Sequence, residues 1–372
     1  MKKLSVLFIL SALVLTATFT ANASGLTARS MGMGGAYTAV GEDISTVLYN
    51  PAGITRSGNF EIHGSGGFMV SDRDKLDDAL DLPGYLEGDF EEDDIEKVYQ
   101  TIPDNLNMKG QAFIGGNIKN LGAAVNITDD VSTTTDDNYR KLENIALAET
   151  IVSYGKEIVS PAMDIGSIAY GANFKYSERR KDSFELEYYE NIDDPEENKM
   201  TTISTSDNGF GADLGVLIKT TDIFRIGMQL ENVVNPEYKM TGEKETTKYN
   251  KDSDEWDGKT KSYTGEKVKS DRKLNVGAAL DVPVLGATLA VDLEDFPLFS
   301  DGDMITRMGL EKNLIFNGLT LRAGTFKEPD YDRMYTAGLG LNLMTLHLDA
   351  AVGFDESLEE NQMMLLSGNI KF

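Results

Sequence analysis

Cysteine is absent from the sequence, and histidine and tryptophan nearly so, with two residues and one residue respectively. Without thiols the chain can form no disulfide and cannot be a cysteine-acylated lipoprotein, so its stability must come from packing and strand pairing. Basic residues are also scarce: 35 Lys and Arg against 61 Asp and Glu give a net charge of −26. That balance excludes binding to nucleic acid or to an anionic membrane through bulk charge.

Long apolar runs are equally scarce, and the one that exists lies at the start. Two lysines precede an apolar run over residues 4–19, and Ala21-Asn-Ala23 has the small residues of a cleavage site. This pattern predicts a secretory signal peptide over residues 1–23, cleaved after Ala23. A retained anchor is the alternative, but the run is short for a spanning helix. No later segment approaches the roughly 18 apolar residues that such a helix needs. The exported chain is therefore either soluble or a β-barrel.

Residues 28–53 are too apolar for a tail and too rich in glycine for an ordinary helix. Gly32, Gly34 and Gly35 allow one backbone to pass close to another, whereas Asn50-Pro-Ala-Gly53 has strong turn chemistry. We therefore predict a compact plug, packed inside another structure, within a unit that spans residues 24–57.

The rest of the chain, residues 58–372, alternates apolar and polar residues with period two. From Tyr335 to Leu343, for example, tyrosine, alanine and leucine occupy one face while threonine, glycine and asparagine occupy the other. The same test predicts fourteen strands, near residues 59–70, 109–118, 120–129, 146–158, 166–188, 200–219, 223–234, 268–282, 286–294, 303–312, 318–327, 333–343, 345–355 and 361–372.

The connections between these strands alternate between short turns and long, charged loops, and an even strand count with this alternation is typical of an outer-membrane barrel. The fold class predicted is thus all-β: a 14-stranded antiparallel transmembrane barrel with the plug inside. A soluble solenoid or sandwich is the alternative, but such a fold gives no reason for short turns at one end of the strands and long loops at the other. The predicted long loops are 71–105, 130–145, 189–199 and 235–267.

The first long loop is strongly acidic, with its densest run at residues 89–96. A solvated surface is the simpler interpretation of such a run. The functional alternative is that loops 71–105 and 235–267 bind divalent cations and bridge to anionic lipid, including lipopolysaccharide, of the outer leaflet. Residues 252–258 resemble a calcium loop only weakly, because the third carboxylate and the glycine are displaced by one position.

Three motifs of the plug resemble the N-terminal hatch of FadL-like outer-membrane barrels: Ala28-Arg-Ser-Met-Gly-Met-Gly-Gly-Ala-Tyr37, then Glu42-Asp43, and finally Tyr49-Asn-Pro-Ala-Gly53. That superfamily includes fatty-acid and hydrocarbon transporters, PorV-type proteins and TraF-like proteins of conjugal-transfer systems. The last strand also ends on Phe372, which resembles the ending that the outer-membrane assembly machinery handles.

This resemblance implies passive transport of hydrophobic compounds, such as fatty acids and hydrocarbons, across the outer membrane of a Gram-negative cell. The alternative within the superfamily is a PorV-like or TraF-like scaffold or shuttle in a secretion or conjugal-transfer system. The family's Asn-Pro-Ala element, which lines or gates the path, corresponds here to Asn50, Pro51 and Ala52. We expect the ligand to be a hydrophobic small molecule.

The residues for enzyme chemistry are few. His63 and His347 fall on predicted lumen faces, and His347 with Asp349 would make an oriented base for a serine. No serine lies in a nucleophile setting, however, and a structural network is the simpler interpretation. Two histidines without neighbouring ligands predict no zinc site. We therefore expect no enzyme activity, no cofactor and no metal.

Two sets of site residues follow from these assignments. The polar lumen network, which we expect to clamp the plug, consists of Asp213, Arg225, Glu231, Asp292, Arg322, His347 and Asp349. The ligand and gate residues of the hatch are Met31, Met33, Tyr37, Leu48, Tyr49, Asn50, Pro51 and Ala52. Ordinary packing of plug against wall explains the apolar members of this second set equally well.

Overall fold

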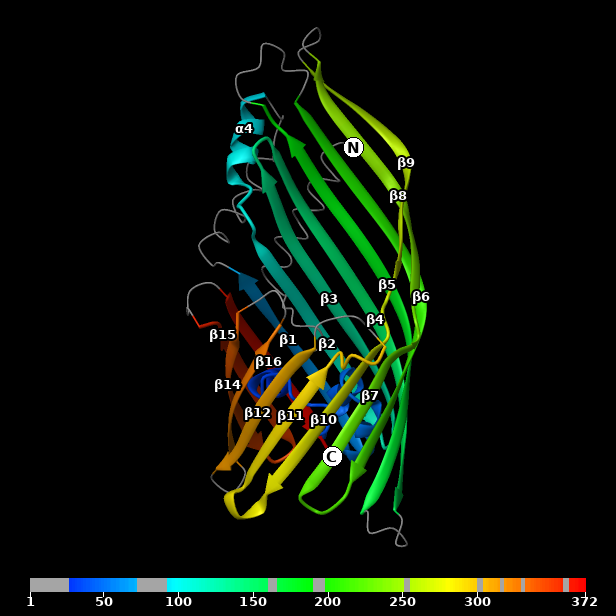
Figure 1. Ribbon diagram of the computed structural model, residues 1–372, viewed down its shortest axis with the longest axis vertical. Coiled ribbons are helices and arrows are strands. Elements are labelled where there is room, and N and C mark those ends of the chain that lie inside the picture. Colours follow the sequence, from blue (N-terminus) through cyan, green and yellow to red (C-terminus); the bar gives the residue numbers. More distant parts are fainter. Residues whose placement is uncertain are drawn as a thin grey trace.

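In the computed structural model, most of the described chain is β-strand (Figure 1). The structure describes residues 27–71, 92–159, 166–189, 198–250, 255–299, 304–314, 318–328, 332–356 and 361–372. The predicted signal peptide lies outside these residues. No helix in the described ranges is long and apolar enough to cross a membrane.

Fourteen antiparallel strands in the described chain close into one barrel, which confirms the predicted fold class in its strand number and closure. The strands pair in sequence order, β7 pairs with β10, and β16 pairs with β1 to complete the wall. The wall strands are β1 (Phe60–Ser71), β2 (Asn107–Ile118), β3 (Leu121–Asp136), β4 (Tyr139–Val159), β5 (Ser167–Glu187), β6 (Lys199–Lys219), β7 (Phe224–Val234), β10 (Lys273–Val282), β11 (Ala287–Glu294), β12 (Ile305–Leu314), β13 (Leu319–Lys327), β14 (Met334–Leu343), β15 (Leu346–Phe354) and β16 (Asn361–Lys371).

The period-two pattern places the apolar residues of each strand on the outside. In β14, Leu339 and Leu341 are 43% and 40% exposed on the outer face, whereas Thr336, on the other face of the same strand, is buried inside. Inward residues are polar or small because they meet either water or another segment of the chain. The wall is therefore apolar outside and polar inside.

The two ends of the barrel differ. Short connections at residues 119–120, 283–286 and 344–345 define what we call the turn end. At the opposite, loop end, β3 to β6 rise far above the other strands of the wall (Figure 1).

Two of the predicted long loops are wrong. Residues 130–145 continue β3 and β4 as a hairpin, and residues 235–267 contain a second hairpin, β8 (Glu237–Asn250) and β9 (Glu255–Lys269). β8 pairs with the upper part of β6, so this hairpin extends the tall side of the wall. Both segments are rich in threonine and charged residues, so they lack the apolar alternation of a strand that faces lipid. The period-two test missed them for that reason.

The other two predicted loops lie partly outside the described residues. In the first, residues 92–101 form a helix, α4 (Glu92–Thr101), and residues 72–91 are not described. Val98 and Ile102 pack with Phe184 and Leu186 of β5, which lie on the same face of that strand as the exposed Phe174. Most of the second loop, residues 190–197, is likewise not described.

The N-terminal segment, residues 27–57, lies inside the barrel rather than in its wall (Figure 1). Its three short helices are α2 (Ala28–Gly32), η1 (Ile44–Leu48) and η2 (Pro51–Arg56). Side-chain oxygens of Thr27, Asp43 and Asn50 cap these helices, each accepting a backbone N–H of the first turn. Local sequence thus fixes the shape of this segment.

The buried apolar residues of the N-terminal segment pack directly on the inner wall. Met33 and Tyr37 pack with small wall residues such as Ala279 and Ala290, whereas Ile44 packs with Phe113. The core of the lower barrel is therefore the contact between this segment and the wall.

Candidate functional site

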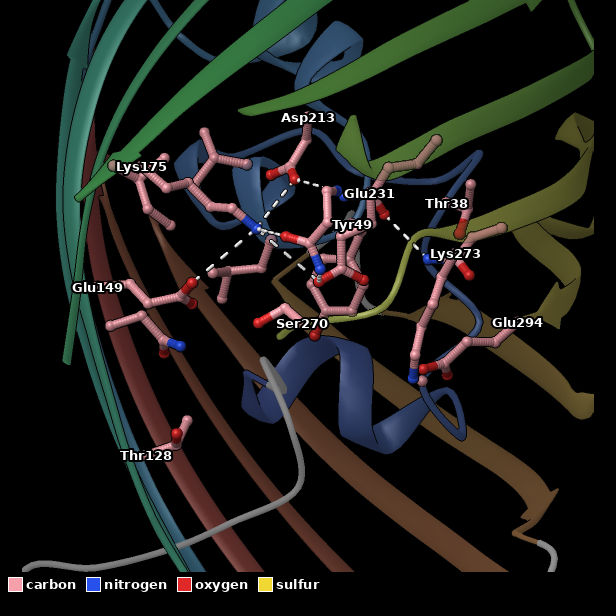
Figure 2. Close-up of a pocket in the computed structure, with 18 of the residues that line it drawn as sticks. Thr38, Tyr49, Thr128, Glu149, Lys175, Asp213, Glu231, Ser270, Lys273 and Glu294 are labelled. Carbon is pink, nitrogen blue, oxygen red and sulfur yellow. Dashed lines mark hydrogen bonds and ion pairs between the residues drawn. The ribbon is translucent and has the colours of Figure 1, made fainter. Parts of the chain in front are cut away.

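A cavity of about 220 Å³ lies between the N-terminal segment and the loop end (Figure 2). Val47, Leu48 and Tyr49 of the segment line it, and Leu147 and Ile151 add apolar surface from β4. The rest of its lining is mostly polar: Thr38, Asn126, Thr128, Glu149, Lys175, Asp213, Gln229, Glu231, Asn232, Ser270, Lys273, Asn275, Asp292, Glu294 and Arg307. One side of the cavity is thus apolar and the others are charged.

Lys175 is the central cation of the cavity and points inward from β5 (Figure 2). Its Nζ lies 2.9 Å from Asp213 Oδ1, 3.8 Å from Glu231 Oε1 and 3.9 Å from Glu149 Oε1, and it donates a hydrogen bond to Asn232 Oδ1 at 3.0 Å. One buried ammonium group therefore holds three carboxylates from three strands. Such a cluster is favourable only while every charge has a partner.

The wall is irregular beside this cluster. The pairing of β6 with β7 shifts between Ala212 and Leu214, and Asn232 has a positive φ of 52°. The side chain of Asp213 replaces the missing ladder bond by accepting the backbone N–H of Asn232 at 2.9 Å. This bulge turns Glu231 and Asn232 toward the cavity.

On the opposite side, wall charges meet the N-terminal segment. Asp292 Oδ2 accepts the backbone N–H groups of Tyr37 and Thr38, both at 2.7 Å. Beside it, Arg307 Nε donates to Glu294 Oε2 at 2.7 Å. The charges of the cavity are thus used largely on each other and on the segment, so a ligand would find few free charges there.

Further contacts fix the segment at both of its ends. Near its start, Arg29 forms two hydrogen bonds to Glu311, at 2.9 and 3.0 Å, and the same Glu311 accepts from Arg322. Near its end, Asn50 Nδ2 donates to the backbone carbonyls of Thr38 and Val216, both at 3.0 Å. The segment is therefore bound to opposite sides of the wall.

The predicted ligand and gate residues divide into three groups. Met31, Met33 and Tyr37 are fully buried against the wall and do not line the cavity, whereas Leu48 and Tyr49 do. Burial raises the pKa of the Tyr49 phenol well above its ordinary value, so this group is neutral. Its hydroxyl lies 2.5 Å from Ser30 Oγ.

The third group is the turn Asn50-Pro51-Ala52, which packs against β5 and β6. An inward Gly171 of β5 makes this possible, because a Cβ there would lie 2.5 Å from the nitrogen of Ala52 and closer still to the carbonyl of Pro51. The wall at this point has no room for any side chain.

The predicted lumen network lies inside the barrel but forms separate clusters. Asp213, Glu231 and Asp292 line the cavity at the loop-end side. Arg322, His347 and Asp349 line a second cavity of about 250 Å³ at the turn end, where Arg322 Nη1 donates to Asp349 Oδ1 at 2.7 Å. Arg225 lines a third cavity, of about 160 Å³, and forms an ion pair with Asp281. The N-terminal segment lies between the first cluster and the other two.

His347 does not form the oriented base considered from the sequence. Its Nδ1 lies 2.7 Å from Asn342 Oδ1, and no hydrogen bond joins it to Asp349 among the described residues. Sequence reasoning also missed Glu149, Lys175 and Arg307, which are charged residues at inward positions of recognised strands. The signal that could have identified them is their position on the inward face of the period-two pattern.

The family model described as "F plasmid transfer operon, TraF, protein" matches residues 106–292, half of the chain. No curated protein sequence matches.

Several solved structures share the fold. The toluene transporter TbuX of Ralstonia pickettii has a TM-score of 0.60 at 12% identity, with 94% of this chain and 99% of that one covered. The toluene transporter TodX of P. putida has a TM-score of 0.60 at 13% identity, with 94% and 99% covered. A FadL homologue of Pseudomonas aeruginosa has a TM-score of 0.56 at 12% identity, with 95% and 98% covered. The barrel is therefore FadL-like in fold.

Proposed function

The chain belongs to the family of F plasmid transfer operon TraF proteins and has a FadL-like fold, and from this premise we propose that it is an outer-membrane channel for passive uptake of hydrophobic compounds. In this proposal the N-terminal segment is a hatch that closes the lumen. The compounds are hydrocarbons and fatty acids, which pass through without chemical change.

One observation carries the proposal: within the described residues, one segment interrupts the lumen and has a cavity on each side. The loop-end cavity holds about 220 Å³, and the two turn-end cavities hold about 250 and 160 Å³. Tyr37, Val47 and Asn50, which separate them, belong to the hatch and to no wall strand. A shift of this segment would join the cavities into a path.

The outside of the wall supports a location in lipid. Large apolar side chains are exposed on strand after strand, including Ile114, Phe174, Leu339, Val352 and Leu366. An apolar outer band of this kind is stable in a bilayer and a liability in water. The expected signal peptide and the FadL-like fold together favour the outer membrane.

The apolar side of the loop-end cavity is the proposed point of capture. An apolar cavity of about 150 Å³ holds a benzene molecule, so the volume here suffices for a small hydrocarbon against Val47, Leu48 and Tyr49. A fatty acid is longer than this cavity and would have to displace the hatch to pass. The paired charges around it provide a polar rim that orients the ligand without binding ions strongly.

The test is uptake by proteoliposomes. Purified full-length protein is reconstituted, and entry of a labelled alkane and of a fluorescent fatty acid is compared with entry into protein-free vesicles. We expect faster uptake with protein, and faster still after deletion of residues 28–53. Uptake equal to that of empty vesicles would overturn the transport proposal, whereas uptake unchanged by the deletion would overturn only the gating role.

The comparisons do not favour the alternative role as a secretion or conjugal-transfer scaffold, because the solved structures of this fold reported above are of transporters and a FadL homologue. Co-purification of a stoichiometric protein partner, together with absence of uptake, would reverse that preference.

A further inference from the structure

Three buried groups meet where the hatch touches β1. Asp43 belongs to the hatch, and Glu61 and His63 project inward from β1; they are 4%, 0% and 2% exposed. His63 Nδ1 lies 4.0 Å from Asp43 Oδ1 and 3.9 Å from Glu61 Oε1. One ligand atom from each of the three residues lies within 4.8 Å of the other two.

The imidazole of His63 has no hydrogen-bond partner on either ring nitrogen in the described structure, and Glu61 Oε2 has none either. Leaving a buried polar atom unsatisfied costs about 1–3 kcal/mol, and more when the group is charged. Three such atoms in one place are therefore expensive. The His63 ring is held in this position by an edge-on contact with Phe113, with ring centres 5.7 Å apart.

The spacing suits a shared ion better than a hydrogen bond. Separations of 3.9 and 4.0 Å exceed the hydrogen-bonding range for an N–H donor and an oxygen acceptor. Two ligands that each lie about 2.1 Å from a tetrahedral ion are about 3.4 Å apart, so a small inward movement would bring all three groups to bonding distance.

We propose that Asp43, Glu61 and His63 bind one divalent transition-metal ion, of which Zn²⁺ is the representative. Imidazole with two carboxylates suits zinc or manganese, whereas calcium and magnesium take oxygen ligands. Nothing in this inference depends on the proposed transport function.

The groups around the ligands hold the carboxylates in place. The Tyr37 hydroxyl donates to Asp43 Oδ2 at 2.8 Å, and Asn369 Nδ2 donates to Glu61 Oε1 at 2.6 Å. These bonds orient two ligands, the usual role of outer partners at metal sites. Asp43 Oδ1 also accepts hydrogen bonds from the backbone N–H and the hydroxyl of Ser45, whereas Glu61 Oε2 has no partner among the described residues and is open to the ion. Arg29 lies 3.9 Å from Asp43 Oδ2 but is hydrogen-bonded to Glu311.

An ion can also reach the site. Asp43 and Asn369 both line the turn-end cavity of about 250 Å³. The bound ion would join the hatch to β1, because one ligand comes from the hatch and two come from the wall. A metal at this point would therefore act as a latch between the two.

The competing interpretation is a protonated His63 that neutralises both carboxylates with no metal. Purified full-length protein in detergent is stripped with EDTA, dialysed against Zn²⁺, and analysed for bound metal by mass spectrometry. His63→Gln removes the imidazole and Glu61→Gln removes one carboxylate at constant size. His347→Gln is the matched control, because it removes the other histidine, whose Nδ1 already faces Asn342.

We expect one Zn²⁺ per chain in the wild type and in the His347→Gln variant, and binding more than about tenfold weaker in the His63→Gln and Glu61→Gln variants. Heat-modified gel migration establishes that each variant is folded. If both ligand variants fail to fold, Co²⁺ absorption of the wild type decides: a ligand-field band that Zn²⁺ abolishes supports the site. Wild-type protein without stoichiometric zinc and without that band, or equal binding in the folded His63→Gln variant, would overturn it.

Discussion

Replacing Gly171 with alanine perturbs the docking of the hatch while removing no charged or hydrogen-bonding side chain from the lumen. The new Cβ would lie 2.5 Å from the nitrogen of Ala52 and would overlap the carbonyl of Pro51. Both are rigid backbone atoms, so no side chain can turn aside. The hatch turn must therefore move away from β5.

The magnitude follows from overpacking. Forcing an extra carbon into a filled core costs about 1–3 kcal/mol. Applied to the equilibrium between a docked and a displaced hatch, this cost raises the displaced population about 5- to 150-fold. The barrel itself should remain intact, because strand pairing of β5 with β4 and β6 does not involve the inward face.

The first assay is uptake of a labelled alkane by proteoliposomes. The second is trypsin cleavage at Arg56, a hatch residue that is half-buried while the hatch is docked. Gly64→Ala is the matched control, because a Cβ at Gly64 has no atom within 4 Å. We expect faster uptake and faster cleavage for Gly171→Ala only. If the two glycine variants behave alike, the turn does not close the lumen by packing on β5.

Three further results follow from the structure. Asn50→Ala removes two hydrogen bonds to backbone carbonyls and a helix cap; at about 1 kcal/mol each, it should loosen the hatch by about 3 kcal/mol and speed its proteolysis. Arg322→Met leaves Asp349 without its ion-pair partner, while Glu311 keeps Arg29, so urea unfolding in lipid should show a loss of about 3–5 kcal/mol. Leu339→Arg places a charge on the outer face and should destabilise the barrel by about 2–4 kcal/mol if that face is in the bilayer; a smaller effect would place it in water.

The sequence predicted the wall well because one physical rule governs it. A strand between lipid and lumen must alternate, so residues such as Leu339 and Thr336 reveal its register without any tertiary information. The same rule failed above the apolar band, where β8 and β9 carry threonine and charges over most of their length.

The interior was harder to predict because its contacts join distant parts of the chain. The sequence identifies Asp213 as inward-facing, but not that Lys175 unites it with Glu149 and Glu231. His63 had no neighbouring ligand in its own strand besides Glu61, so the sequence predicted no metal site. Asp43 reaches it only because the hatch folds into the lumen. Proximity of this kind is set by docking rather than by local pattern.

In the proposed mechanism the hatch must move before a hydrophobic compound can pass, so a reversible lock on the hatch should stop uptake. A Cβ at Gly277 of β10 would lie 2.9 Å from Thr38 Cβ in the hatch. A shift of about 1 Å would bring the pair to the usual disulfide separation of about 3.8 Å. Because the chain has no cysteine of its own, the double variant Thr38→Cys, Gly277→Cys can form only this bridge.

The measurement is alkane uptake by proteoliposomes of that variant, oxidised and then reduced, so that both states carry the same substitutions. We expect little uptake above protein-free vesicles in the oxidised state and recovery on reduction. Equal uptake in the two states, with the bridge shown to be complete, would contradict it.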